Sequence, residues 1–128
     1  MQPEFIVLYE RAKAVLRPRQ LSKNSFAGSV AAAIETPSGA VYTGVCIDTP
    51  CSMGFCAEHA AAAAMVTAGE SRVVRLIAVY EDGSVIPPCG RCREFLTALA
   101  DGNRQARIMV DQKTELTLGE LLPWDWKA

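Results

Sequence analysis

Apolar residues recur along the chain with two different periods, and each period predicts a different kind of element. Between residues 3 and 17 they return every three or four positions with charged residues between them, which is typical of an amphipathic helix. Pro18 follows, and proline cannot continue a helix because it lacks the backbone N–H and its ring clashes with the preceding turn. We therefore expect an N-terminal helix with an apolar face made of Phe5, Leu8, Tyr9, Ala12 and Leu16.

The rest of the chain alternates between strand-like and helix-like segments. After a polar link at residues 22–25, two stretches rich in Val, Ile, Ala and Thr flank the turn sequence Pro37-Ser38-Gly39 and predict a β-hairpin. Small residues after Cys56 form one helical stripe that stops at Gly69, a residue type that commonly follows a helix end. The expected strands cover residues 29–36, 40–48, 73–80, 107–110 and 115–117, and the expected helices cover residues 56–68 and 89–99, with a final helical turn at 118–122.

This order of elements indicates an α/β fold with a mixed sheet of about five strands flanked by helices. A length of 128 residues is typical of one domain, so we assign residues 1–128 to a single domain. Apolar residues make up 50% of the chain and charged residues 21%, a composition that can bury a core and excludes a disordered chain.

The net charge and the number of cysteines indicate which classes of partner and which cellular compartment to expect for this protein. The net charge is −1, which gives no general attraction to a polyanion, so we expect neither nucleic acid nor a membrane as partner. No targeting segment is visible, and no run approaches the roughly 18 apolar residues of a membrane span, so a cytoplasmic protein is expected. In the cytoplasm, five cysteines are expected to be metal ligands, catalytic groups or core residues rather than disulfide partners.

Three of the cysteines stand at the starts of two predicted helices. Cys56 opens the first helix, and Cys89 and Cys92 lie in the first turn of the second, after Pro87-Pro88. A Cys-x-x-Cys pair at a helix start directs both sulfurs to one point, and a third cysteine completes a set of three thiolates. Zinc favours thiolates, and three protein ligands leave its fourth position open, as in catalytic sites. Glu58 follows two residues after Cys56, where it could take a proton from water activated by the metal.

Other interpretations of the same residues stay open at this point. A structural zinc site would take a fourth ligand from His59, Cys46 or Cys51, and Cys89 and Cys92 alone could form a redox pair. Neither alternative accounts for a glutamate two positions after the first ligand. On a helix, His59 points about 100° away from Glu58, so we expect it to support a metal ligand or to pack in the core, and not to act as the base. Arg91 and Arg93 are the nearest cations in sequence that could offset the thiolate charge.

Cys56-Ala57-Glu58, followed by Pro88-Cys89-Gly90-Arg91-Cys92, resembles the cytidine deaminase superfamily in its three-cysteine branch. The resemblance implies a three-layer fold, one zinc ion per chain held by the three cysteines, and proton transfer by Glu58. It also implies that the Ala57 backbone N–H and the Pro88 carbonyl hold the reacting oxygen and amine. Near the C-terminus, Trp126 occupies the place of an aromatic residue in the family pattern. Such enzymes are usually homotetramers with shared active sites, so a homotetramer (or homodimer) is expected.

The chain departs from the cytidine deaminase pattern at the residues that would contact the substrate. Gly28 stands where the family carries a phenylalanine, and Phe26 lies two residues earlier. Cys46 and Asp48 stand where the family carries Asn and Glu. We take Ala57, Pro88, Asp48, Phe26, Cys46 and Trp126 as the candidate substrate-binding residues.

The predicted function is zinc-dependent hydrolytic deamination of a cytosine-type nucleoside, or a close analogue, to the uracil-type product and ammonia. The partner is then a small-molecule nucleoside or amino-heterocycle. One alternative is a deaminase of a nucleoside antibiotic, similar to blasticidin-S deaminases, or of another amino-heterocycle. The non-enzymatic alternative is a binding module stabilised by structural zinc.

Overall fold

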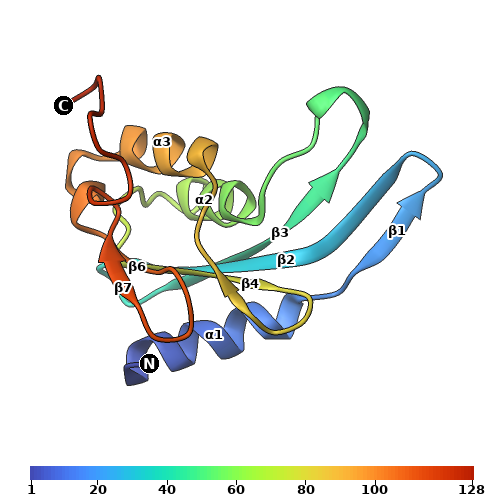
Figure 1. Cartoon of the computed structure of the whole chain (residues 1–128), viewed down its shortest axis with the longest axis horizontal. Helices are drawn as coiled ribbons and strands as arrows, with labels where there is room; N and C mark the ends of the chain where they lie inside the picture. The colour runs from blue at the N-terminus through green and yellow to red at the C-terminus, as the bar shows by residue number, and fades with distance from the viewer.

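A twisted seven-stranded sheet lies between helix α1 on one face and helices α2 and α3 on the other (Figure 1). The computed structural model describes all 128 residues. The elements are α1 (Pro3–Val15), β1 (Arg19–Ser22), β2 (Ser25–Glu35), β3 (Val41–Asp48), η1 (Pro50–Ser52), α2 (Ala57–Thr67), β4 (Arg75–Tyr80), β5 (Val85–Ile86), α3 (Gly90–Leu99), η2 (Asp101–Gln105), β6 (Arg107–Met109) and β7 (Glu115–Thr117). None of the helices combines the length and the apolar character that a membrane span requires.

The long strand β2 organises the sheet because it pairs with three other strands. β3 runs antiparallel to it over most of its length, while β1 pairs with its first residues and β4 with residues 30–35. β4 continues the sheet through an antiparallel pairing with β5 and a parallel pairing with β6, and β7 closes the far edge against β6. The sheet is therefore mixed, as expected from the sequence.

Alternate residues of the central strands enter two separate hydrophobic cores. In β2, Ala31 and Ala33 face α1, whereas Ala32 and Ile34 face the side of α2 and α3. β4 alternates in the same way, since successive side chains of a strand point to opposite faces. The core under α1 contains Phe5, Leu8, Ala12, Ile77 and Val79, and the core under α2 and α3 contains Met65, Leu76, Ala78, Leu96 and Ile108.

Small residues allow α2 to lie directly on the sheet. A Cβ atom at Gly44 of β3 would stand 2.4 Å from the backbone N of Ala61 and 2.6 Å from Cβ of Ala60. Any side chain at position 44 would push the helix away from the sheet. The alanines of α2 thus set the distance between the sheet and the helix that carries Glu58.

Most of the elements expected from the sequence are confirmed. The polar link at residues 22–25 is the tight turn between β1 and β2, held by a 3.0 Å hydrogen bond between the hydroxyls of Ser22 and Ser25, and the sequence did not predict β1 or the start of β2 at Ser25. The final helical turn expected at residues 118–122 is present only as consecutive hydrogen-bonded turns: the Leu121 N–H reaches the Thr117 carbonyl at 3.3 Å and the Leu118 carbonyl at 3.1 Å, and no helix continues from them.

Candidate active site

The start of α2 is tied to the end of β3. Phe55 and Ile47 exchange two backbone hydrogen bonds, of 2.9 and 3.0 Å, in an isolated β-bridge. Gly54 makes this approach possible, because a Cβ atom there would stand 2.0 Å from the Ile47 carbonyl oxygen. Cys56 follows in an extended conformation as the residue that precedes the first turn of α2.

The start of α3 lies opposite that of α2 and is built in a similar way. Cys89 precedes the first helical turn in an extended conformation, after Pro87 and Pro88 have ended the short strand β5. Cys92 falls in the first turn of α3 and is fully buried. The positive ends of both helices therefore point toward one group of sulfurs, which favours their ionised form.

The three sulfurs are spaced as ligands of one metal ion. The Sγ atom of Cys89 lies 3.4 Å from that of Cys56 and 3.5 Å from that of Cys92. All three lie within 4.8 Å of one another, and they are the only group of this kind in the chain. Tetrahedral zinc with Zn–S bonds of about 2.3 Å needs sulfurs roughly 3.8 Å apart. The donor set therefore fits zinc in number, chemistry and spacing.

The electrostatics of the thiols favour a bound cation. Burial raises the pKa of Cys56 to about 11, and the neighbouring Cys89 thiol adds to that rise. Burial likewise raises the pKa of Cys92. Burial opposes ionisation of Cys89 as well, but hydrogen bonds from the Cys92 backbone N–H and from the two other thiols lower its pKa. Three thiolates this close together are stable only beside a positive charge, which a bound metal ion would provide.

Glu58 lies in the first turn of α2 with only 4% of its surface exposed. Its carboxylate makes no hydrogen bond to another side chain and lines a pocket that also contains Cys56 and Cys89. Burial raises the pKa of this carboxyl, although the Glu58 backbone N–H partly offsets the rise. A raised pKa makes this carboxyl a better proton acceptor than an exposed glutamate, as a group that accepts and then releases a proton requires.

The pocket has a volume of about 400 Å³ and extends from the sulfurs toward the end of β3. It contains three of the substrate-binding candidates, Ala57, Cys46 and Asp48. The Sγ atom of Cys46 lies 3.3 Å from the hydroxyl oxygen of Ser29 on β2, so these two side chains form one wall of the pocket. A volume of this size is typical of small-molecule sites.

Three other candidates lie outside this pocket. The register of β2 against β3 shifts between Ala27 and Ala31, and Phe26 lines a neighbouring polar groove that shares only Asp48 and Thr49 with the pocket. Pro88 is buried and is not among the lining residues, although its neighbour Pro87 is, and its carbonyl accepts a 2.8 Å hydrogen bond from Nε of Arg93.

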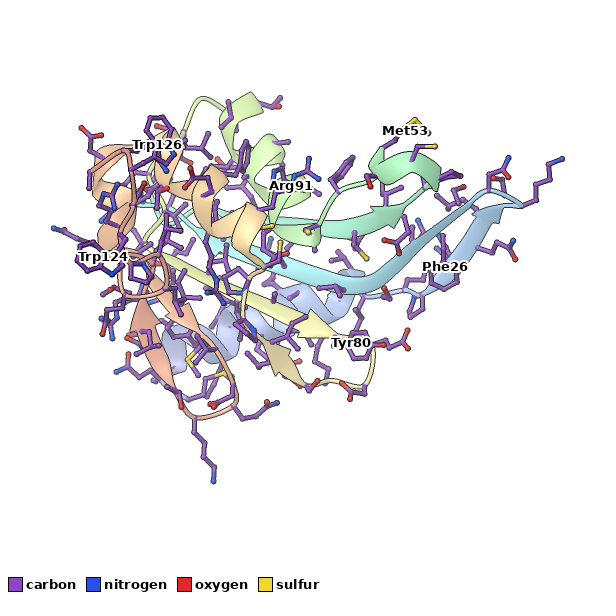
Figure 2. The ribbon with its side chains drawn as sticks, turned by 45° about the horizontal axis from the view of Figure 1, so that its top comes forward. Phe26, Met53, Tyr80, Arg91, Trp124 and Trp126 are labelled. Carbon is purple, nitrogen blue, oxygen red and sulfur yellow. The ribbon has the colours of Figure 1, made fainter.

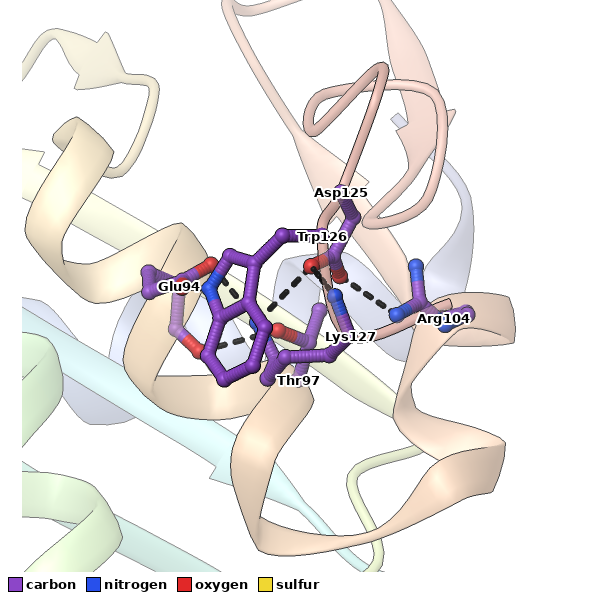
Figure 3. A network of polar contacts seen from close by, with 6 residues as sticks. All are labelled: Glu94, Thr97, Arg104, Asp125, Trp126 and Lys127. Carbon is purple, nitrogen blue, oxygen red and sulfur yellow. Dashed lines mark hydrogen bonds and ion pairs between the residues drawn. The ribbon is translucent and has the colours of Figure 1, made fainter.

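Trp126 lies on the outer side of α3, at the end of the molecule opposite Phe26 (Figure 2). Its indole N–H donates a 2.7 Å hydrogen bond to Glu94, and Lys127 binds the same carboxylate at 2.6 Å. Asp125 pairs with Arg104 and with Lys127, which completes the network that fixes the C-terminal segment (Figure 3). Within one chain, Trp126 therefore does not reach the pocket.

Among the lining residues that were not candidate substrate contacts, Phe55 and Arg91 have the largest side chains beside the sulfurs. Phe55 lies beside Cys56, and an aromatic residue next to a metal ligand is the signal that could have found it. Arg91 extends from the start of α3 across the pocket, where its guanidinium lies 3.5 Å from the Gly54 carbonyl oxygen (Figure 2). Arg93 was expected to offset the charge of the thiolates. Its guanidinium instead donates hydrogen bonds to the carbonyls of Pro88 and Leu121.

His59 lies beside the site, as its position on the helix predicts. Its Nδ1 atom is 3.3 Å from Sγ of Cys92, and its ring stacks on Phe95 with centroids 4.0 Å apart. Burial and the nearby Arg91 lower its pKa. His59, Cys46 and Cys51 all lie outside the three-sulfur group.

Comparison with known proteins identifies the family of this chain. No protein-family profile matches the sequence. The cytidine deaminase of Mycobacterium tuberculosis is 35% identical over 97 residues, which are 74% of this chain and 70% of that protein. The chain belongs to the cytidine deaminase family. A second family member, from Halalkalibacterium halodurans, is 35% identical over 108 residues, which are 77% of each chain.

Solved structures of cytidine deaminases agree with the chain over nearly its whole length. The crystal structure from Mycobacterium tuberculosis superposes with a TM-score of 0.81 at 28% identity and covers 98% of both chains. The structure from Mycobacterium leprae gives a TM-score of 0.79 at 27% identity and covers 95% of this chain and 99% of that one. The three-layer cytidine deaminase fold expected from the sequence is confirmed.

Proposed function

We propose that the chain is a zinc-dependent hydrolytic deaminase that converts a cytosine-type nucleoside to the uracil-type nucleoside and ammonia. One observation carries this proposal: the buried Glu58 carboxylate lines the same pocket as Cys56 and Cys89, two of the three thiols that are spaced for zinc. Membership in the cytidine deaminase family supports the choice of substrate. We assign the metal to Cys56, Cys89 and Cys92, with one zinc ion per chain. Zinc bound there acts as a Lewis acid that makes water nucleophilic near neutral pH.

Glu58 carries the protons of the reaction. It accepts a proton from the attacking water, delivers it to the ring nitrogen next to the amino-bearing carbon, and then passes the second proton of that water to the departing amine. Water thus replaces the amino group, and ammonia leaves. A carboxyl with 4% exposure exchanges these protons with the substrate and not with bulk water.

Backbone groups at the two helix starts position the reacting atoms. The N–H of Ala57 belongs to the first turn of α2, where backbone donors have no partner inside the helix, and Ala57 lines the pocket. We propose that it binds the developing oxygen. The Pro88 carbonyl is held by Arg93, and its second lone pair is available to the leaving amine.

The far end of the pocket would hold the sugar. Asp48 is exposed there, and its carboxylate can accept a hydrogen bond from a hydroxyl group. Phe55 supplies an aromatic surface for the flat base, and the wall formed by Ser29 and Cys46 completes the enclosure. Trp126, which lies outside the pocket of its own chain, remains a predicted contact to the substrate of a neighbouring chain. Phe26 lines the adjacent groove, and we do not propose it as a contact to the substrate.

A second candidate is deamination of a modified cytosine nucleoside or another amino-heterocycle. Its support is the Ser29–Cys46 wall, which offers a thiol where the family pattern has an amide, together with the polar groove beyond Asp48. A parallel screen of cytidine, deoxycytidine, blasticidin S and pterins for ammonia release separates the two candidates. Rapid turnover of cytidine favours the first candidate, and turnover of only another compound favours the second.

We further propose that the enzyme is a cytoplasmic homotetramer. All five cysteines are unpaired, which suits a reducing compartment. Ala63 and Ala64 lie exposed on the outer side of α2, where a second helix could pack closely. Light scattering on the purified protein tests the assembly, with four chains expected and a monomer or dimer contradicting it.

Replacement of Glu58 by Gln tests the mechanism. The amide keeps the shape of the side chain but cannot carry the proton, so kcat should fall by about 10²–10⁴-fold while the zinc content stays near one per chain. Glu10→Gln on the exposed surface of α1 is the matched control and should retain full activity. Unchanged turnover in a zinc-loaded Glu58→Gln protein would contradict the assigned role.

A further inference from the structure

His59 contacts the most buried of the three cysteines. Its Nδ1 atom lies 3.3 Å from Sγ of Cys92, a residue with no exposed surface, whereas Cys89 is exposed and Cys56 is half-buried. Water can therefore solvate the two other sulfurs but not that of Cys92. The only polar side chain outside the cysteine group that is hydrogen-bonded to Cys92 is His59.

The direction of the hydrogen bond follows from the chemistry of the ligand. A thiolate bound to a metal has lone pairs and no proton, so it can only accept a hydrogen bond. The proton between the two atoms must therefore reside on Nδ1. The contact selects the form of the imidazole that carries hydrogen on Nδ1, whatever the state of Nε2.

Stacking holds the ring in the orientation that this hydrogen bond requires. The imidazole and the ring of Phe95 are 4.0 Å apart between centroids and inclined by only 16°. Phe95 lies on α3, one turn after Cys92, while His59 lies on α2. The stack therefore holds the His59 ring of α2 against the Cys92 sulfur of α3.

Neither of the nearby arginines donates a hydrogen bond to Cys92. Arg93 donates to the carbonyls of Pro88 and Leu121, and Arg91 reaches toward the carbonyl of Gly54. Three thiolates and one Zn²⁺ carry a net charge of −1, so a donor at one sulfur reduces the excess electron density on the metal.

We infer that His59 is a positioning residue that donates an Nδ1–H···S hydrogen bond to Cys92, and that Phe95 orients it, so that the metal is a stronger Lewis acid. This inference rests on the proposed function, because it needs a metal ion on the three cysteines. Its effect passes through the sulfur and not through contact with the substrate.

Cobalt substitution tests the inference with a pair of matched variants. His59→Phe keeps an aromatic ring on Phe95 but has no N–H, whereas His59→Asn loses the ring but places an amide N–H near the position of Nδ1. Loss of the hydrogen bond makes the thiolate a better donor. The sulfur-to-cobalt charge-transfer band should therefore shift to longer wavelength in His59→Phe and stay near the wild-type position in His59→Asn.

Metal affinity gives a second readout on the same proteins. Chelator competition should show about 10–100-fold weaker metal binding in His59→Phe, the usual cost of losing a hydrogen bond to a metal ligand. An unchanged band and affinity in His59→Phe would overturn the inference. A shift in His59→Asn as large as that in His59→Phe would overturn it as well.

The wild-type protein provides a measurement that does not depend on the folding of a variant. His59 is the only histidine, so a long-range ¹H–¹⁵N spectrum of the zinc-loaded protein contains a single imidazole. A proton on Nδ1 supports the inference, and a bare Nδ1 overturns it. Wild-type protein that binds no cobalt through sulfur would overturn the proposed function and the inference together. Wild-type protein that loads metal and deaminates, while His59→Phe keeps its band, would overturn the inference alone.

Discussion

Replacement of Asn103 by alanine should destabilise the protein by about 3 kcal/mol. Asn103 has no exposed surface and connects three segments of the backbone. Its Oδ1 atom accepts a 2.7 Å hydrogen bond from the Val73 N–H, and its Nδ2 atom donates to the carbonyls of Leu96 and Ser71 at 2.9 and 3.0 Å. The side chain thus joins α3, which carries two of the zinc ligands, to the segment before β4.

The magnitude follows from the groups that alanine would leave unpaired. The Val73 N–H and the Leu96 carbonyl belong to fully buried residues, and each unpaired buried group costs about 1–3 kcal/mol. The Ser71 carbonyl belongs to an exposed residue and can bind water, so its loss costs little. Together the two groups would cost about 2–6 kcal/mol. We expect about 3 kcal/mol, in the lower half of that range, because the structure around the site relaxes.

Urea denaturation in equal excess zinc measures this change. With an m value of about 1.5–2 kcal/mol/M, the midpoint should fall by roughly 1.5–2 M. Asn24→Ala is the matched control, because Asn24 is exposed and its side chain makes no hydrogen bond, and it should change stability by less than about 0.5 kcal/mol. A loss below about 1 kcal/mol for Asn103→Ala would refute the reasoning.

Two further predictions concern the C-terminal segment and the pocket. The pKa of Asp125 is lowered from 3.8 to about 2, because the Lys127 backbone N–H, the Lys127 ammonium and Arg104 outweigh the effect of burial. Its ionised form therefore stabilises the fold above pH 3.8, and the stability difference between wild type and Asp125→Asn should shrink as the pH falls toward 2; a constant difference in urea denaturation would contradict this. Phe55→Ala should raise KM for cytidine about tenfold, or about 1.4 kcal/mol, whereas Phe26→Ala should change it less than about twofold. Steady-state kinetics measure both KM values, and a larger rise in KM for Phe26→Ala than for Phe55→Ala would contradict the placement of the pocket.

The parts of the site that the sequence predicts best depend on local geometry. Cys56 and Glu58 lie at the start of α2, and Cys89 and Cys92 at the start of α3, so the spacing along the chain fixes the relative positions of the residues within each pair. The two helices themselves could also be predicted from local signals. A glycine-containing loop precedes α2, which is rich in small residues, and two prolines precede α3. His59 was placed correctly for the same reason, because the helical period determines its direction relative to Glu58.

The substrate contacts could not be predicted as well because they depend on interactions across the fold. Whether Phe26 faces the pocket is decided by a register shift within β2, which no residue pattern reveals. Trp126 is held away from the pocket by Glu94, 32 residues earlier in the chain. The strand β1 (Arg19–Ser22) is polar and mostly exposed, so it lacks the apolar alternation by which a strand is detected.

The central claim is that the three cysteines and Glu58 form a zinc-dependent deaminase site. The most direct measurement is the release of ammonia from cytidine by the purified protein, together with its zinc content. We predict about one zinc ion per chain and the formation of uridine and ammonia in equal amounts, with turnover lost on chelation and restored by zinc. Folded, zinc-loaded protein that leaves cytidine and related aminopyrimidines unchanged would contradict the account.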